Sequence, residues 1–374
     1  MTLRDHLARR IAAEGPLSLA EYMNECLLNP RFGYYTTRDP LGAKGDFITA
    51  PDISQMFGEL IGLSLAQSWL DQGAPNPFVL AELGPGRGTL MADILRATAK
   101  VPGFHAAARL HLVEVSERMR AQQGVTLAQH APEWVDQVSD LPELPLWLVA
   151  NEFFDALAIR QFRRDGDMWR ETMVGARNGE DDSNSSIGAD TASADNALIF
   201  GLAPPAPLAA LAHRLNDTSE GDIVELCPSA APIAKAIGAR IETHGGAALI
   251  IDYGDWRSLG DTFQAMRAHG ATDPLETPGA ADLTAHVDFE VLAKATPSAH
   301  SLLTTQGVFL ERLGITDRAQ KLAAGLSGAA LETLISAHRR LTHPQEMGTL
   351  FKVIAFHPTT TAPPPGVEAT GHRT

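Results

Sequence analysis

Three glycines that directly follow a short apolar run could bind a nucleotide. Gly84, Gly86 and Gly88 occupy alternate positions in "AELGPGRGTL" (81–90), at the end of the run "FVLAEL". A glycine-rich turn between a strand and a helix lets backbone N–H groups approach a bound nucleotide closely. NAD is the first alternative, but Thr89 stands where the pattern G-x-G-x-x-G has its last glycine. The turn therefore indicates a nucleoside ligand and disfavours NAD.

Two glutamates at predicted strand ends narrow the choice of ligand. Glu82 ends the first strand, where its carboxylate would repel a pyrophosphate and attract the ammonium and sulfonium of S-adenosylmethionine. Glu114 ends the next strand, "RLHLVEV", where a carboxylate can accept both hydroxyls of a ribose. The alternative is that both glutamates are exposed loop carboxylates. Together with the glycines, they favour S-adenosylmethionine as the cofactor and methyl transfer as the reaction.

A further polar group follows a later strand, in "ANEFFDALAI" (150–159). The carboxyl ends of parallel strands line the ligand crevice in sheets of this kind. We therefore expect Asn151 to contact the cofactor, and Glu152 and Asp155 to face the transferred methyl as catalytic residues. A solvated turn is the alternative, although the two phenylalanines inside this loop argue against it.

Alternating strand and helix patterns from about residue 78 onward must position these side chains. Strands are predicted at "FVLAELG", "RLHLVEV", "WVDQV", "LWLVANE", "ALIIDYG", "SLLTTQ" and "TLFKVIAFH". Helical segments such as "TLMADILRATAK" lie between them. Roughly seven strands with helical crossovers indicate an α/β fold with a doubly wound, Rossmann-like sheet of the class I methyltransferase type.

The remaining segments define the predicted domains. These are an N-terminal helical extension and lid over 1–75, the methyltransferase domain over 76–357 and a disordered tail over 358–374. An insertion at about 156–245 starts with a β-hairpin around Asp165-Gly166. The same insertion contains an acidic loop, 178–196, which is expected to be disordered because it has little apolar content.

Composition excludes several classes of partner. The net charge of −15 argues against broad binding to nucleic acid or to anionic lipid. No apolar run reaches the length of a membrane span, so no membrane insertion is expected. The two cysteines, Cys26 and Cys227, show no metal-binding spacing, and no metal is predicted. The first residues show no signal or transit peptide, which predicts a cytoplasmic protein.

Several blocks of the sequence resemble one known family. "GYYTTRDPLGAKGDFITAPDISQMFGELIG" (33–62) and "NEFFDAL" are the most specific, and "ELGPGRG", "VELCPSA", "IIDYG", "ADLTAHVDF", "QGVFLERLGI" and "MGTLFKV" follow in the family's order. The chain resembles the MidA, or mitochondrial complex I assembly-factor, family of type II protein arginine methyltransferases. The resemblance implies a seven-strand S-adenosylmethionine fold and symmetric dimethylation of an arginine in a quinone-site subunit of respiratory complex I. The absence of a presequence fits a bacterial member, and the 178–196 insertion is a departure from the family.

Arginine chemistry gives the polar residues possible roles. The guanidinium is a poor nucleophile because its pKa lies above about 12. Paired carboxylates bind its planar fork and can receive the released proton. Glu152 is the first candidate and Asp155 the second, and His286 could relay the proton unless it is a structural histidine.

Substrate-binding candidates lie outside the strand ends. They are Asp46 and Phe47, in a segment that either covers the cofactor as a lid or only braces the sheet, and Asp288. The predicted partner is a protein substrate, with the oligomeric state open. The alternatives are a methyltransferase of another protein or of a small molecule, and an assembly chaperone that binds S-adenosylmethionine without turnover.

Overall fold

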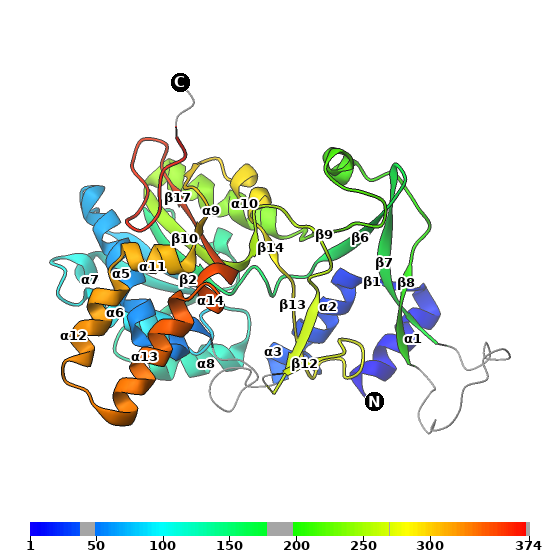
Figure 1. Ribbon diagram of the computed structural model, residues 1–374, viewed down its shortest axis with the longest axis horizontal. Helices are drawn as coiled ribbons and strands as arrows, with labels where there is room; N and C mark the ends of the chain where they lie inside the picture. The colour runs from blue at the N-terminus through cyan, green and yellow to red at the C-terminus, as the bar shows by residue number, and fades with distance from the viewer. Residues whose placement is uncertain (38–48, 178–196, 269, 372–374) are drawn as a thin grey trace.

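Two sheets on opposite sides of Figure 1 organise the chain. The structure is a computed structural model that describes residues 1–37, 49–177, 197–268 and 270–371. The main path of the larger sheet runs, in spatial order, through β15 (Ala299–His300), β17 (Phe351–His357), β10 (Gly246–Asp255), β5 (Leu146–Asn151), β2 (Phe78–Leu83), β3 (Ala108–Val113) and β4 (Glu133–Val135). Neighbours from β10 to β4 are parallel, whereas β17 runs antiparallel to β10 and β15. The predicted α/β fold with a mostly parallel sheet is confirmed.

Two further short strands extend this sheet beyond the predicted number. They are β14 (Val287–Asp288), parallel to the end of β10, and β15, whereas β16 (Thr304–Thr305), antiparallel to β17, lies within the predicted strand "SLLTTQ". The larger sheet therefore has nine strands in the described residues rather than seven. Strands of two residues carry too little alternation to be recognised from sequence.

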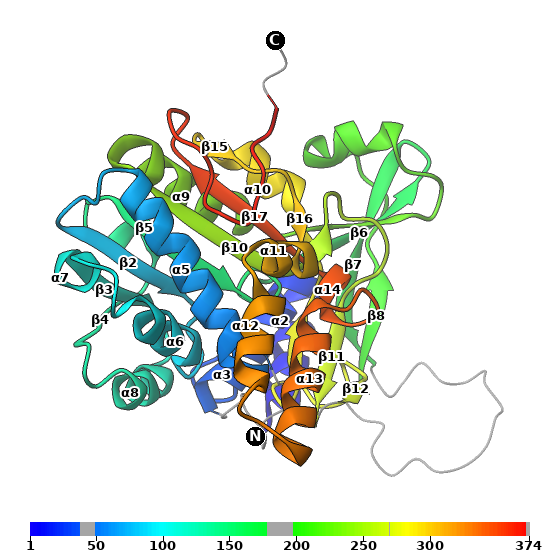
Figure 2. The ribbon, with the colours of Figure 1, turned by 60° about the vertical axis from the view of Figure 1, so that its left-hand side comes forward.

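The larger sheet is buried on both faces, which explains its continuous apolar runs. Every residue of β2 is buried, with Phe78 and Leu80 in one core and Val79, Ala81 and Leu83 in the other. Parallel strands covered by helices on both sides have this composition. The first core is formed with α5 (Gln55–Asp71), α6 (Thr89–Thr98), α11 (Gln306–Arg312), α12 (Ile315–Ala323) and α13 (Gly328–Thr342), and the second with α9 (Ala230–His244) and α10 (Phe289–Ala295). Figure 2 shows α5 lying across β5 and β10, which it contacts.

The remaining elements form a second lobe around the smaller sheet. Its strands are β1 (Leu17–Ser18), β7 (Met168–Ala176), β6 (Arg160–Asp165) and β9 (Ile223–Leu226), with β8 (Leu198–Leu202) paired to β7. A three-stranded sheet of β11 (Gln264–Arg267), β12 (Gly270–Thr272) and β13 (Asp282–Thr284) lies beside them. The helices α1 (Leu3–Glu14), α2 (Leu19–Leu28) and α3 (Tyr34–Thr37) complete this lobe.

The lobes do not follow the predicted domain boundaries. A core that includes Leu7, Tyr22, Val174 and Leu283 joins the N-terminal helices to the inserted strands, so the first helices belong to the second lobe. By contrast, α5 packs on the larger sheet although it lies within the predicted 1–75 extension. A sequence pattern shows which residues are apolar but not which distant apolar face will cover them.

The insertion and the tail also differ from their predictions. The hairpin is confirmed, since β6 pairs antiparallel with β7 and Asp165 faces Met168. The insertion is shorter than 156–245 because α9 packs on the larger sheet as the crossover between β5 and β10. Residues 178–196 lie outside the described residues.

The tail was predicted to be disordered, but residues 358–371 pack against the larger lobe. The Ser64 hydroxyl donates to the Pro365 carbonyl at 2.7 Å, and Leu302 N–H donates to the Glu368 carbonyl at 2.7 Å. A Pro/Thr-rich composition predicts little helix or strand, but it does not prevent a segment from bonding to a folded surface. None of the helices in the described residues combines the length and apolar character needed to cross a bilayer.

Candidate active site

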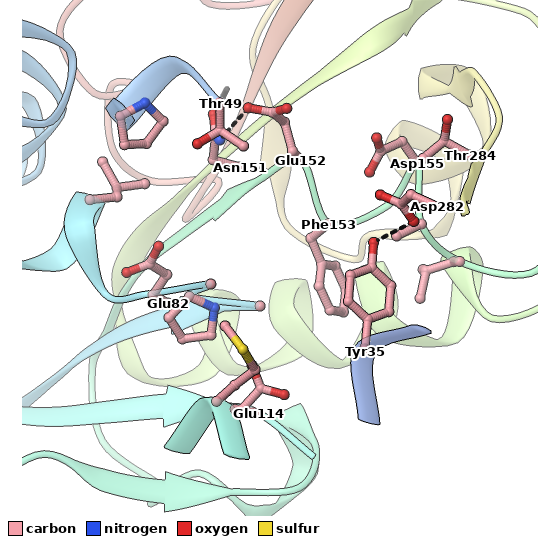
Figure 3. Close-up of a pocket in the computed structure, with 18 of the residues that line it drawn as sticks. Tyr35, Thr49, Glu82, Glu114, Asn151, Glu152, Phe153, Asp155, Asp282 and Thr284 are labelled. Atoms are coloured by element: carbon pink, nitrogen blue, oxygen red, sulfur yellow. Dashed lines mark hydrogen bonds between the residues drawn. The ribbon is translucent and has the colours of Figure 1, made fainter. Parts of the chain in front are cut away.

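A pocket of about 730 Å³ opens where the parallel strands of the larger sheet end, and both lobes line it. Eight of the predicted residues line this pocket: Glu82, Gly84, Gly86, Glu114, Asn151, Glu152, Asp155 and His286. Figure 3 labels five of them. In the close-up, Glu82 and Glu114 lie on one side and Asp155, Asp282 and Thr284 on the other, with Phe153 between. The pocket therefore has two ends that differ in their residues.

The glycine turn needs its glycines for backbone reasons. Gly84, Gly86 and Gly88 have φ angles of 56°, 52° and 80°, in the left-handed region that favours glycine. A Cβ on Gly84 would lie 3.0 Å from the Phe153 ring. Gly88 is the N-cap of α6 and, unlike the other two, is not among the described residues that line the pocket. The turn leaves the backbone open to a ligand at the start of the helix.

Two buried oxygen atoms at this end of the pocket could accept hydrogen bonds from a ligand. Glu82 is only 3% exposed, and within the described residues its Oε2 has no hydrogen-bond partner. Burial raises the pKa of Glu82 to about 8. The Asn151 Oδ1 is also buried, again with no partner in the part of the chain that the structure describes. A ligand with an ammonium group would satisfy both oxygens, so this end fits S-adenosylmethionine.

Glu114 is held in place at the end of β3. Its Oε1 accepts the Ser116 N–H at 2.8 Å, and its Oε2 accepts the Gln123 amide at 3.1 Å. The same amide donates to the Gly86 carbonyl at 2.8 Å, and Trp134 fixes Gln123 by donating to its Oε1 at 2.8 Å. Burial raises the pKa of Glu114. Gln123 thus joins the ribose-binding candidate to the glycine turn, a role that no pattern in the sequence indicated.

Glu152 and Asp155 mark the other end of the pocket. Glu152 is half-buried, and its Oε1 accepts the Asn151 amide at 3.0 Å and the Ala50 N–H at 3.3 Å. Burial, and then the charge of Asp155, raise the pKa of Glu152 to about 8. Asp155 is 5% exposed, and its Oδ1 has no hydrogen-bond partner among the described residues. Burial raises the pKa of Asp155 to about 6.

Residues of the second lobe, which no sequence pattern indicated, also line this end of the pocket. The Tyr35 hydroxyl on α3 donates to Asp282 Oδ1 of β13 at 2.8 Å, as Figure 3 shows. Asp282 is buried, and Thr284 of the same strand lines the pocket beside it. Burial and the charges of Asp282 and Asp155 raise the pKa of Tyr35. Asp282 and Thr284 belong to the block "ADLTAHVDF", from which the sequence analysis selects His286 and Asp288 instead.

Those two residues, His286 and Asp288, bond neither Glu152 nor Asp155 in the described contacts. His286 lines the pocket, with its ring 5.3 Å from that of Tyr253, and it is bonded to no carboxylate in the described contacts. Burial and the charge of Lys352 lower the pKa of His286. Asp288 caps α10, accepting the Val291 N–H at 3.2 Å, and it is absent from the described lining of the pocket. A capping carboxylate in a loop cannot be told from a binding one by sequence alone.

The predicted lid is described only in part. Asp46 and Phe47 lie outside the described residues. The short helix α4 (Ala50–Ile53) follows them, and its Asp52 forms a 2.6 Å ion pair with Arg87 of the glycine turn. Both residues line the pocket. The segment before α5 therefore contacts both the glycine turn and Glu152.

The fold and this pocket define a class I methyltransferase that depends on S-adenosylmethionine, and comparison with known proteins agrees. A family model described as S-adenosyl-L-methionine-dependent methyltransferase matches residues 60–308. The mitochondrial protein arginine methyltransferase NDUFAF7 of Xenopus tropicalis is 36% identical over 97% of this chain and 88% of its own length. The human protein is 36% identical over 94% of this chain and 82% of its own length.

Solved structures support the same assignment. A protein from Burkholderia thailandensis, described as a methyl transferase, was crystallised with S-adenosyl-homocysteine. It is 29% identical to this chain and superposes with a TM-score of 0.79, over 97% of this chain and 94% of its own. A native structure of a Burkholderia thailandensis superfamily protein gives a TM-score of 0.77 at 28% identity, covering 100% of this chain and 95% of that one. This chain belongs to the family of S-adenosylmethionine-dependent methyltransferases that includes NDUFAF7.

The prediction of a cytoplasmic, bacterial enzyme is contradicted by these relatives. The curated proteins are mitochondrial and come from eukaryotes, although the matched crystal structures are bacterial. The prediction rested on the first residues alone. The folded lobes that these proteins share carry no physical mark of their compartment.

Removal of the Glu114 carboxylate should weaken cofactor binding. In Glu114→Ala the dissociation constant for S-adenosylmethionine should rise about ten- to a hundredfold, because hydrogen bonds to a charged group contribute about 1.5–3 kcal/mol. Calorimetry measures this change. Glu133→Ala, which removes an exposed glutamate from neighbouring β4, is the matched control and should leave the constant unchanged. Equal constants for Glu114→Ala and the control would exclude Glu114 from the ribose site.

Glu82 should ionise when the cofactor binds. A pKa of about 8 keeps most of this carboxyl protonated at neutral pH, and an adjacent ammonium favours the ionised form. At pH 7, binding of S-adenosylmethionine should release about one proton more from the wild type than from Glu82→Gln. Calorimetry in buffers of different ionisation enthalpy measures the difference.

The same group gives a stability test. Because its folded pKa of about 8 lies above the ordinary 4.5, the neutral carboxyl stabilises the fold fully below pH 4.5, and this contribution is lost as pH rises to about 8. Between these pH values, the Tm of the free Glu82→Gln protein should therefore fall less than the Tm of the free wild type. Equal proton release and equal pH dependence of Tm in the wild type and in Glu82→Gln would refute the assignment of Glu82 to the ammonium of the cofactor.

Proposed function

We propose that this enzyme transfers methyl groups from S-adenosylmethionine to a protein arginine, forming dimethylarginine. The observation that carries the proposal is the pair of carboxyl groups in one pocket, half-buried Glu152 and buried Asp155, both with raised pKa values. Such a pair is unfavourable in its ionised form until a cation enters. The names of the relatives, which are protein arginine methyltransferases, agree with a guanidinium as that cation.

The shape of the pair favours arginine over lysine. A guanidinium is planar, presents five N–H donors in a fixed fork and stays charged, whereas an ammonium is a compact point charge. Two carboxylates on one loop, with Asp282 on the same side of the pocket as Asp155, offer several acceptors to a fork. Phe153, which lines the pocket between its two ends, adds an apolar wall for the flat face.

The cofactor is assigned to the opposite end. We assign the ammonium to Glu82, the ribose hydroxyls to Glu114, and the remaining polar contacts to Asn151 and the glycine turn. When bound, S-adenosylmethionine supplies a methyl group on a positively charged sulfur. Glu152 and Asp155 bind the guanidinium, orient one of its nitrogens toward the cofactor end and accept the proton that this nitrogen loses as its bond to carbon forms.

The two raised pKa values suit this proton transfer. A guanidinium between the carboxyl groups lowers both pKa values, so that they bind it in their ionised forms. The methylated guanidinium keeps one positive charge after it loses this proton, so one carboxylate stays ionised beside it. Burial favours the neutral form of the other carboxyl, which can hold the released proton until the product leaves. An assembly chaperone that binds S-adenosylmethionine without turnover has no need of this pair.

Loss of one charge should abolish methylation and leave the cofactor bound. Glu152→Gln preserves the shape of the side chain, so the dissociation constant of S-adenosylmethionine should change less than threefold, by about 0.6 kcal/mol. Methylation of an arginine peptide, followed by mass spectrometry, should fall by roughly two to four orders of magnitude, the usual range for general acid–base groups. A peptide with lysine in place of the arginine should not react with the wild type. Normal turnover of Glu152→Gln, or equal turnover of lysine, would refute the arginine assignment.

The protein substrate that we propose is a quinone-site subunit of respiratory complex I, supported by the family resemblance of 33–62 and "NEFFDAL". Mass spectrometry of complex I from cells that lack this gene should show one arginine without its two methyl groups. The wild-type gene should restore them, and the Glu152→Gln gene should not. Identical methylation of every complex I subunit with and without the gene would place the substrate elsewhere.

A further inference from the structure

A buried aspartate behind the catalytic loop is used by none of the steps above. Asp252 lies near the end of β10, in the block "IIDYG", and its exposure is 0%. It is absent from the described lining of the pocket, so it does not meet a ligand there. Its role must therefore act through the residues that it contacts.

Those contacts are with the backbone of the loop that carries Glu152 and Asp155. Asp252 Oδ2 accepts three consecutive N–H groups, from Phe153 at 3.2 Å, Phe154 at 2.9 Å and Asp155 at 3.2 Å. Its Oδ1 accepts the N–H of Tyr253 at 3.0 Å. Successive N–H groups that converge on one anion form a nest, a turn whose shape depends on that anion.

The nest sets the direction of Glu152. Ladder bonding between β5 and β10 continues as far as the Glu152 N–H, which donates to the Ile251 carbonyl at 3.0 Å. The chain then turns sharply, and Glu152 has a φ of 51°, which is rare and strained for a residue with a side chain. Such a conformation persists only where the surrounding contacts impose it, and the three bonds to Asp252 begin at the very next residue.

Charge links the same groups. Burial raises the pKa of Asp252, and so do the charges of Asp155 and Glu152, while the N–H donors of the loop oppose this shift. In its ionised form Asp252 bonds all four N–H groups and adds to the negative potential behind the pocket, which favours a bound cation. A neutral side chain of the same shape would bond the nest more weakly.

We propose that Asp252 is a positioning residue that fixes the backbone of the Glu152–Asp155 loop and thereby aims both carboxylates at the substrate cation. This inference rests on the proposed function for the identity of that cation. The anchoring of the loop itself does not depend on which substrate is methylated.

The test compares Asp252→Asn with Glu59→Gln. Glu59 is a matched control because it is also a buried carboxylate, 5% exposed, but it bonds Arg96 and Arg318 outside the described lining of the pocket. In Asp252→Asn, hydrogen exchange of the amides at 153–155 should accelerate about tenfold or more, since the charged acceptor is gone. The dissociation constant of S-adenosylmethionine should change less than about threefold.

Kinetics then separate positioning from a merely structural role. For an arginine peptide, kcat/KM of Asp252→Asn should fall about ten- to a hundredfold, with KM raised as well as kcat lowered. Glu59→Gln should change Tm and leave the exchange at 153–155 and kcat/KM as in the wild type. If Asp252→Asn does not fold, Asp252→Glu carries the same comparison, because it keeps the charge but displaces the carboxylate by one methylene.

Two results would overturn the inference. One is that the amides at 153–155 of Asp252→Asn exchange hydrogen as slowly as in the wild type. The other is that these amides exchange faster while kcat and KM stay at their wild-type values. Failure of the arginine proposal looks different, because the wild-type enzyme itself would then not turn over the arginine peptide.

Discussion

An ionised carboxylate loses its hydration when it is buried, and it is stabilised again only by a cation or by N–H donors. The parallel strands β2, β3, β5 and β10 all end at one edge, and each brings an acidic residue there: Glu82, Glu114, Glu152 and Asp252. Burial raises the pKa of Glu82 and of Glu152 to about 8. Burial also raises the pKa of Asp252, but backbone N–H groups bond its carboxylate, so it can act as an anchor. The carboxyl groups without enough N–H donors need a cation, and they therefore determine where the cationic groups of the cofactor and substrate are expected to bind.

S-adenosylmethionine carries an ammonium and a sulfonium, and the proposed substrate adds a guanidinium, so this pocket brings several positive charges together. Like charges repel, and a low-dielectric pocket increases that repulsion. Separate acidic groups at the two ends of the pocket offset it: Glu82 at one end, and Glu152, Asp155 and Asp282 at the other. The second lobe matters for this reason, because it supplies Asp282 and the tyrosine that holds it. Its core unites the first helices with strands from the middle of the chain.

Local patterns predicted the larger sheet and the position of the glycine turn, for physical reasons. Continuous apolar runs reveal strands buried on both faces, and a glycine triplet after such a run reveals a turn with positive φ angles. The residues that the sequence did not reveal depend on contacts across long separations. Tyr35 reaches Asp282, and Asp252 reaches a loop about a hundred positions earlier, as the separation of 98 between Asp252 and Phe154 shows. Asp288 and the tail were misjudged because capping bonds and surface packing leave little trace in composition.

The central claim is that a guanidinium lies between Glu152 and Asp155, and a structure of the enzyme with S-adenosyl-homocysteine and an arginine peptide tests it most directly. The account predicts guanidinium nitrogens within about 3.2 Å of carboxylate oxygens of both residues, while the homocysteine end lies beside Glu82. A peptide whose arginine lies outside this pocket, or whose guanidinium meets neither carboxylate, would contradict the account.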